Sequence, residues 1–118
     1  MPEAPRPLRP PRPIGPARHE LPAIDDAALN AAIHADRLLA AAEASGITRW
    51  AAYLGPLPDR LRDGDLRDVR LAAMRARAAY GPKDSIRDAL PAELTEPFLE
   101  SVDRLLKALA RRELRSEA

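Results

Sequence analysis

Two histidines, His19 and His34, are the side chains of this sequence that could bind a metal or act as a general base near neutral pH. A catalytic zinc ion needs about three protein ligands, and the chain has no cysteine to add to the histidines. His19 also falls in a proline-rich segment rather than in a predicted helix. We therefore predict that the protein holds neither a metal nor a cofactor.

Serine and aspartate are the other residue types that could take part in catalysis. The serines fall at predicted helix ends or on a polar face, where hydroxyls cap helices or meet solvent; they are Ser45, Ser85, Ser101 and Ser116. Paired carboxylates also lie at helix boundaries, at Asp25 with Asp26 and at Asp63 with Asp65. The five glycines are isolated helix stops, so no phosphate-binding loop is predicted. An enzyme would need Asp36 and His34 to converge in one pocket, and we predict that the protein is not an enzyme.

A basic stripe marks the predicted helix at residues 66–80. The stripe consists of Arg67, Arg70, Arg75 and Arg77, of which Arg67, Arg70 and Arg77 share one face of the helix. Such a stripe can contact the phosphates of duplex DNA. Aspartates at positions 59, 63, 65 and 68 precede or open the helix, so the local charge is mixed, and no tight helix-turn-helix spacing is present. We expect a solvated or ion-paired face, with nucleic acid as the alternative partner.

Trp50 is the single tryptophan of a chain in which aromatic residues make up 3%. A large aromatic side chain in an alanine-rich bundle is expected to fill the core, and the alternative is an exposed anchor for a partner. So few aromatics weigh against single-stranded nucleic acid as a partner, because its bases stack on aromatic side chains.

The first 22 residues are rich in proline and arginine. Proline fixes φ, lacks an N–H donor and disfavours helical backbone at the preceding residue, so residues 1–22 are predicted to form an extended or disordered arm. Overlapping Pro-x-x-Pro units flanked by Arg6, Arg9 and Arg12 have the form that docks in aromatic-lined grooves. The arm is therefore expected to be a tether or a second contact to a partner.

The remaining residues, 23–118, have helical patterning throughout. They predict an all-α fold, a small antiparallel bundle of three longer helices and one or two short ones. The first long helix is expected at residues 27–44, capped by Asp25 or Asp26 and ended by Gly46. The arc predicted to face its core consists of Ala28, Leu29, Ala32, Ile33, Asp36, Leu39 and Ala40.

The later helices are marked by caps, breakers and apolar spacing. Residues 48–63 predict one kinked helix or two short ones, and Ser85 opens another short helix. Asp65 begins the second long helix, which is expected at residues 66–80. The last helix is predicted to start near Pro97 and to reach about residue 114. Its apolar stripe is Phe98, Val102, Leu105 and Leu109.

Length and composition restrict the class of protein. A chain of 118 residues, 46% of them apolar, forms one small domain that can bury a core without disulfides. The longest apolar run, residues 38–42, is far shorter than the roughly 20 residues that cross a bilayer, and no signal peptide is recognised. We therefore expect a cytoplasmic protein that does not enter membranes. Its 19 basic and 18 acidic side chains give no global reason to bind nucleic acid, and the abundance of arginine and alanine indicates a GC-rich bacterial genome.

The order of these features resembles a known family. Arg49-Trp50 is followed by Gly64-Asp65, an Ala/Arg-rich helix to Gly81-Pro82, then Arg87 and the run Arg-Leu-Leu-Lys-Ala-Leu at 104–109. Over residues 49–110 this order resembles the CATRA-associated small proteins, short actinobacterial chains encoded beside caspase-like and repeat-containing components of predicted conflict systems. The resemblance implies an accessory partner in a defence or signalling complex and carries over no catalytic residue.

Together these patterns predict a non-catalytic helical interaction or adaptor protein that binds another protein or a second copy of itself. The absence of a reactive cluster and the apolar surface on the first and last helices support this prediction. The candidate contact residues are Arg6, Arg9, Arg12, Trp50, Arg67, Arg70 and Arg77. The alternative is a small DNA-binding regulator of the antitoxin type, which would use the helix at 66–80 and the arginines of the arm.

Overall fold

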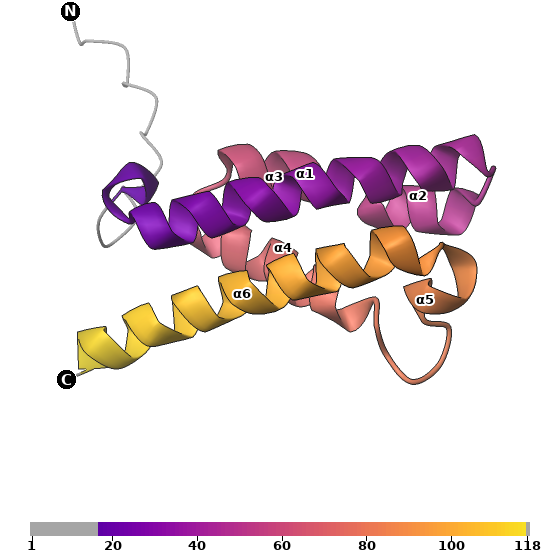
Figure 1. Ribbon diagram of the computed structural model, residues 1–118. Helices are drawn as coiled ribbons and strands as arrows, with labels where there is room; N and C mark the ends of the chain where they lie inside the picture. The colour runs from indigo at the N-terminus through magenta and orange to yellow at the C-terminus, as the bar shows by residue number, and fades with distance from the viewer. Residues whose placement is uncertain (1–16, 118) are drawn as a thin grey trace, which may run out of the picture.

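The computed structural model describes residues 17–117, with side chains placed for residues 17–114. Over this range the chain is all α and contains no strand. It has three long helices, α1 (Pro22–Ala44), α4 (Leu66–Ala78) and α6 (Ala92–Glu117) (Figure 1). The short helices α2 (Thr48–Leu54) and α3 (Leu57–Asp63) lie between α1 and α4 in the chain, and the short helix α5 (Ile86–Ala89) lies between α4 and α6. The all-α prediction is confirmed, although the described chain has three short helices instead of one or two.

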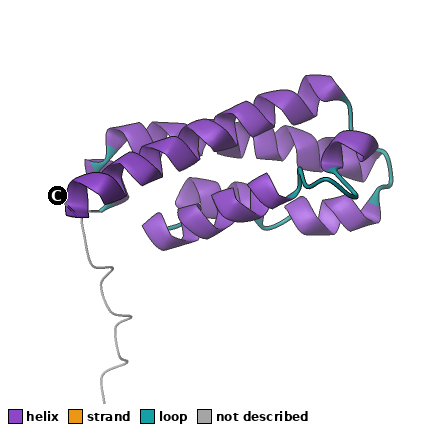
Figure 2. Cartoon of the chain, turned by 90° about the horizontal axis from the view of Figure 1, so that it is seen from below, coloured by secondary structure: helices purple, strands orange, loops and turns teal. Residues whose placement is uncertain are grey.

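The helices form an antiparallel bundle of four columns (Figures 1 and 2). α1, α4 and α6 are single columns, and α2 and α3 follow each other as a broken fourth column. α1 packs on α2, α3 and α6, while α4 packs on α3 and α6. α1 and α4 therefore occupy opposite corners of the bundle, and each has an outward face that no other helix covers.

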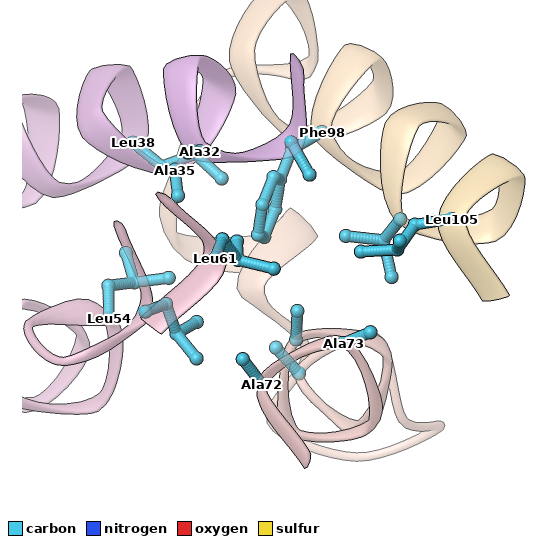
Figure 3. Packing of buried hydrophobic residues seen from close by; sticks show 14 of the residues in the cluster. Ala32, Ala35, Leu38, Leu54, Leu61, Ala72, Ala73, Phe98 and Leu105 are labelled. Carbon is cyan, nitrogen blue, oxygen red and sulfur yellow. The ribbon is translucent and has the colours of Figure 1, made fainter. Parts of the chain in front are cut away.

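Phe98 lies in the centre of the core, where it is fully buried together with Leu61 and Leu105 (Figure 3). On the α1 side the core is lined mainly by alanines, which include Ala28, Ala31, Ala32 and Ala35. Because alanine extends so little beyond the backbone, neighbouring helices can pack close to α1 and the larger side chains opposite fill the space.

The beginning of the described chain differs from the predicted extended arm. Arg18–Glu20 forms a 3₁₀ turn, η1, and α1 starts at Pro22, five residues before the expected start. Proline suits this first helical position because the N–H it lacks would have no partner there. Arg18 holds the turn in place, with Nε 2.7 Å from Asp25 Oδ1 and Nη1 donating to the carbonyl oxygen of Gly64 at 2.9 Å. Residues 17–22, which were predicted to belong to the arm, therefore fold together with the helical domain. Residues 1–16 of the predicted arm lie outside the described residues.

The core-facing arc predicted for α1 is wrong by roughly one residue of helical rotation. Leu29, Ile33 and Asp36 face outward, and Ile33 is 50% exposed. Of the predicted arc, Ala28 and Ala32 are buried and Leu39 is half-buried, while Ala40 is exposed. The side chains that do face the core are Ile24, Ala27, Ala28, Ala31, Ala32, Ala35, Leu38 and Ala42.

The apolar stripe of α6 is confirmed, since Phe98, Val102, Leu105 and Leu109 are all buried. The helix nevertheless begins at Ala92, and Pro97 lies inside it rather than near its first residue. The carbonyl of Pro91 accepts hydrogen bonds from the N–H groups of Leu94 and Thr95, which starts the helix before Pro97 is reached. Pro97 then removes only one backbone hydrogen bond close to the helix start.

The predicted helix ends are confirmed at several turns. Gly46, with φ of 68°, follows α1 in the left-handed region that glycine adopts without strain. The side chain of Asp65 accepts a hydrogen bond from the backbone N–H of Asp68 at 2.9 Å and caps α4. Gly64 precedes this cap at a close approach, where an added Cβ would lie 2.7 Å from the Cβ of Asp68. Residues 48–63 form two short helices, the second of the two alternatives.

Candidate interaction surface

Two of the four arginines of the predicted basic stripe, Arg70 and Arg77, join α4 to α6. Arg70 forms an ion pair with Glu113, and Arg77 Nε lies 3.2 Å from Asp103 Oδ1. Arg67 is exposed and has no ion-pair partner in the described part of the chain. On the face that these three arginines share, acidic side chains of α6 therefore neutralise Arg70 and Arg77, and Arg67 remains for an external contact.

Arg75 lies on the other side of α4, where it contacts Tyr53 of α2. Its Nε donates to the carbonyl oxygen of Tyr53 at 3.2 Å, and the Tyr53 hydroxyl donates to the carbonyl oxygen of Arg75 at 2.6 Å. The guanidinium lies 4.1 Å from the centroid of the tyrosine ring, within the range of a cation–π contact. These reciprocal contacts connect α2 to α4, and no sequence pattern predicted them.

Trp50 belongs to the core, as the favoured sequence prediction has it. Its side chain is only 6% exposed, and its ring meets the ring of Tyr53 edge-on at 5.4 Å between centroids. A buried indole has too little free surface to anchor a partner. Trp50 is therefore a core residue and does not form part of an exposed contact surface.

Arg87, which belongs to the family-like residue order, makes internal contacts. It forms an ion pair with Glu96 at 2.9 Å, and its guanidinium lies 5.3 Å from the ring centroid of Tyr80. Hydrogen bonds from Arg87 and Thr95 hold the pKa of Glu96 below its ordinary value. This group connects the turn at α5 to α6 and gives no sign of a reactive site.

His34 and Asp36 do not converge, because residues two apart point to different sides of a helix. Asp36 lies beside α3 and pairs with Arg62 at 2.9 Å. His34 lines a hollow of about 190 Å³ that also includes Glu100, Ser101 and Arg104. The Ser101 hydroxyl donates to the carbonyl oxygen of Phe98 at 2.7 Å, so it is engaged with the backbone. No paired nucleophile and base is formed by these side chains.

The pKa of His34 is expected to lie below 6.5, because partial burial and the positive charge of Arg37 disfavour the imidazolium, against the opposing effect of Glu100. Arg37→Gln should raise this pKa, and Glu100→Gln should lower it further. An NMR titration of the imidazole resonances measures all three values. Because the unfolded chain binds the His34 proton more readily, protonation of His34 favours unfolding. The free energy of unfolding should therefore be highest above pH 6.5 and should decrease as the pH falls from 6.5 through the pKa of the folded state. A His34 pKa at or above 6.5 would contradict this expectation.

The outward face of α4 carries the large apolar side chains that the sequence analysis did not single out. We call the α4 face the set Arg67, Leu71, Met74 and Ala78. Leu71 is 52% exposed and Met74 is 55% exposed. Beside Met74 lies a hollow of about 200 Å³, lined in addition by Leu106 and Ala110 of α6 and bordered by the Arg70 and Glu113 pair. The apolar surface therefore continues from α4 onto the edge of α6.

A third hollow, of about 500 Å³, lies between the N-terminal half of α1 and the C-terminal half of α6. Ala23, Ala27 and Ala108 line it, and Asp26 and Arg104 are among its polar side chains. Arg104 also pairs with Glu100 at 3.3 Å. The charges around this hollow are mixed, so they favour no particular ligand.

Comparison with known proteins provides no further guide. No protein-family model, curated protein or solved structure matches this chain. The resemblance over residues 49–110 thus stays a prediction.

The described residues allow two statements about other classes of site. Among them, no three histidine, aspartate or glutamate side chains are grouped so that they could hold a metal ion. None of the described helices is long and apolar enough to cross a bilayer. The predicted contacts at Arg6, Arg9 and Arg12 lie outside the described residues.

Proposed function

We propose that this protein is a non-catalytic helical interaction protein that binds another polypeptide through the α4 face. The observation that carries this proposal is the exposure of Leu71 and Met74 by more than half on adjacent turns of one helix. Leaving two such side chains in water forgoes the free energy that their burial would supply, about 1.5–3 kcal/mol for each side chain when it is fully buried. An apolar patch with charged neighbours is typical of a protein-binding surface.

The ion pairs of α4 support a protein partner over DNA. A DNA-binding helix needs several cations that are free to contact phosphates. Arg70 and Arg77 are already paired with Glu113 and Asp103. Release of these arginines would leave two carboxylates facing the nucleic acid, which is unfavourable. Absence of any salt-dependent shift of duplex DNA at low ionic strength is the result we expect in a gel-retardation assay.

The setting of the interaction is proposed from the sequence resemblance. By this proposal the protein is a cytoplasmic accessory component of a bacterial defence or signalling complex. The proline- and arginine-rich arm would add a second contact through Arg6, Arg9 and Arg12. Neighbouring genes would then encode the partner proteins, which makes their products the first candidates to test.

Light scattering coupled to size-exclusion chromatography tests the proposal, with the full chain alone and coexpressed with each neighbouring gene product. We expect a complex of defined mass in at least one of these samples. The double substitution Leu71→Ser with Met74→Ser should abolish that complex. Ile33→Ser is the matched control, because Ile33 is similarly exposed but lies on α1 at the opposite corner. A monomer in every sample, or a complex unaffected by the α4 substitutions, would refute the proposal.

A further inference from the structure

We propose that the occupant of the α4 face is a second copy of this chain, with the two α4 helices antiparallel across a twofold axis. This inference rests on the proposed function and identifies the partner. The members of the α4 face follow one another at intervals of four, three and four residues, the spacing of a coiled-coil seam. With the axis between Leu71 and Met74, Leu71 of one copy faces Met74 of the other at both symmetry-related positions. The most exposed apolar side chains of α4 then cover each other.

The charges on one side of this seam are complementary to themselves. Asp68 and Arg75 are seven residues apart on the side of α4 that faces α2. A twofold axis perpendicular to α4 brings this side against the same side of the second copy. Asp68 of each copy then faces Arg75 of the other, which gives two identical intermolecular ion pairs.

Both of these groups are available for the ion pairs. Asp68 has no ion pair, and its carboxylate accepts no hydrogen bond among the described residues; only its backbone N–H is used, in the cap of α4. Arg75 uses Nε for its hydrogen bond to Tyr53, so its two terminal nitrogens remain able to donate. The contact with Tyr53 also holds the guanidinium in place, which lowers the entropy lost when a carboxylate binds it.

The charges on the two sides of the seam together favour the antiparallel orientation. On the other side of the seam, Arg70 of one copy approaches Arg77 of the second copy, but each arginine carries its own counter-ion, Glu113 or Asp103. In a parallel pair, residues on opposite sides of the seam meet with an offset of about five residues, which places Arg70 against Arg75. The parallel arrangement therefore gives Arg75 no carboxylate across the seam, whereas the antiparallel arrangement places Asp68 of the second copy beside it.

The outward face of α1 has the same spacing but is a poorer seam. Its members are Leu29, Ile33, Asp36 and Ala40. Asp36 lies in the middle of this row and pairs with Arg62. Covering it with an apolar partner would remove a charged pair from water, which costs free energy. The comparison makes Ile33 a suitable control position for a test of the α4 seam.

Sedimentation velocity of the full chain over a range of concentrations tests the inference. We expect the wild-type protein to shift from monomer to dimer as concentration rises. Leu71→Asp should raise the dimer Kd by about 30-fold or more, as expected for a charge placed at the centre of an interface. Ile33→Asp should leave the Kd unchanged, and circular dichroism establishes that each variant is folded. A dimer that Leu71→Asp does not weaken would overturn the inference.

A charge exchange tests the twofold geometry itself. Asp68→Arg alone places two arginines together, since the new guanidinium faces Arg75 of the second copy at both positions. Arg75→Glu alone places two acids together. Each variant should therefore be monomeric at concentrations where the wild type is dimeric. An equal mixture of the two variants should form a heterodimer. In it the new arginine at position 68 of one chain faces the new glutamate at position 75 of the other, and the unchanged Arg75 faces the unchanged Asp68, so both contacts join opposite charges.

The outcome that contradicts the twofold geometry does not depend on both variants. If the Arg75 variant does not fold, weakening of the dimer by Asp68→Arg alone is the decisive result. A dimer that this substitution does not weaken would overturn the inference.

The two proposals fail in different ways. A wild-type chain that stays monomeric alone but forms a complex with a neighbouring gene product through Leu71 and Met74 would remove the second copy as occupant and keep the interaction function. A chain that is monomeric alone and with every neighbouring product would remove both.

Discussion

Replacing Phe98 with alanine is expected to lower the free energy of unfolding by about 3–5 kcal/mol. Phe98 is the largest of the fully buried side chains, and its ring points toward the middle of the bundle on the side of Leu61 (Figure 3). The loss combines the transfer of the ring to water in the unfolded chain with the cavity that the neighbouring helices cannot close. Since small domains are stable by only about 5–15 kcal/mol, the variant should lie close to its unfolding midpoint under mild conditions.

Urea denaturation followed by far-ultraviolet circular dichroism measures this effect. Leu114→Ala is the matched control on the same helix, because Leu114 is 68% exposed. It should change the free energy of unfolding by no more than about 0.5 kcal/mol. Similar effects of the two substitutions would contradict the central position assigned to Phe98.

Replacing Ala35 with leucine is expected to destabilise the bundle by up to about 3 kcal/mol, although leucine is the more hydrophobic residue. Ala35 is fully buried on the face of α1 that lies against the core (Figure 3). The added carbon atoms have no space to enter, so α1 must move away from its neighbours or the new side chain must leave its preferred rotamers. A close approach at this face is therefore part of what stabilises the fold.

The same substitution at Ala40 provides the control for Ala35. Ala40 is exposed on α1, so Ala40→Leu adds the same atoms where nothing obstructs them. Thermal unfolding should show a lower midpoint for Ala35→Leu and a nearly unchanged midpoint for Ala40→Leu. A stabilising effect of leucine at position 35 would show that space exists there and would contradict the packing described for α1.

The sequence identifies the buried face of a helix more clearly when that face carries large apolar side chains than when it carries alanine. On α6, large apolar residues recur at one helical spacing, so Phe98, Val102 and Leu105 identify the buried face without ambiguity. On α1, alanine occurs on several sides and carries little directional information. The predicted arc included the larger residues Leu29 and Ile33, which are exposed, so it was centred too far toward the solvent.

The candidate site was harder to predict than the fold, because its properties depend on contacts between helices. The sequence places Arg70 and Arg77 on one face of α4, but their partners Glu113 and Asp103 lie on α6. Helical spacing relates residues within one helix and does not show which charges another helix brings nearby. For the same reason the contact between Arg75 and Tyr53 had no sequence signature.

The break between α2 and α3 has a consequence for the order in which the chain folds. Each of these helices has seven residues, and helices shorter than roughly 12 residues do not persist in water by themselves. The broken column must therefore gain its helical backbone while it docks on α1, which acts as its template. Folding should therefore begin in the longer helices, and α2 and α3 should become helical late.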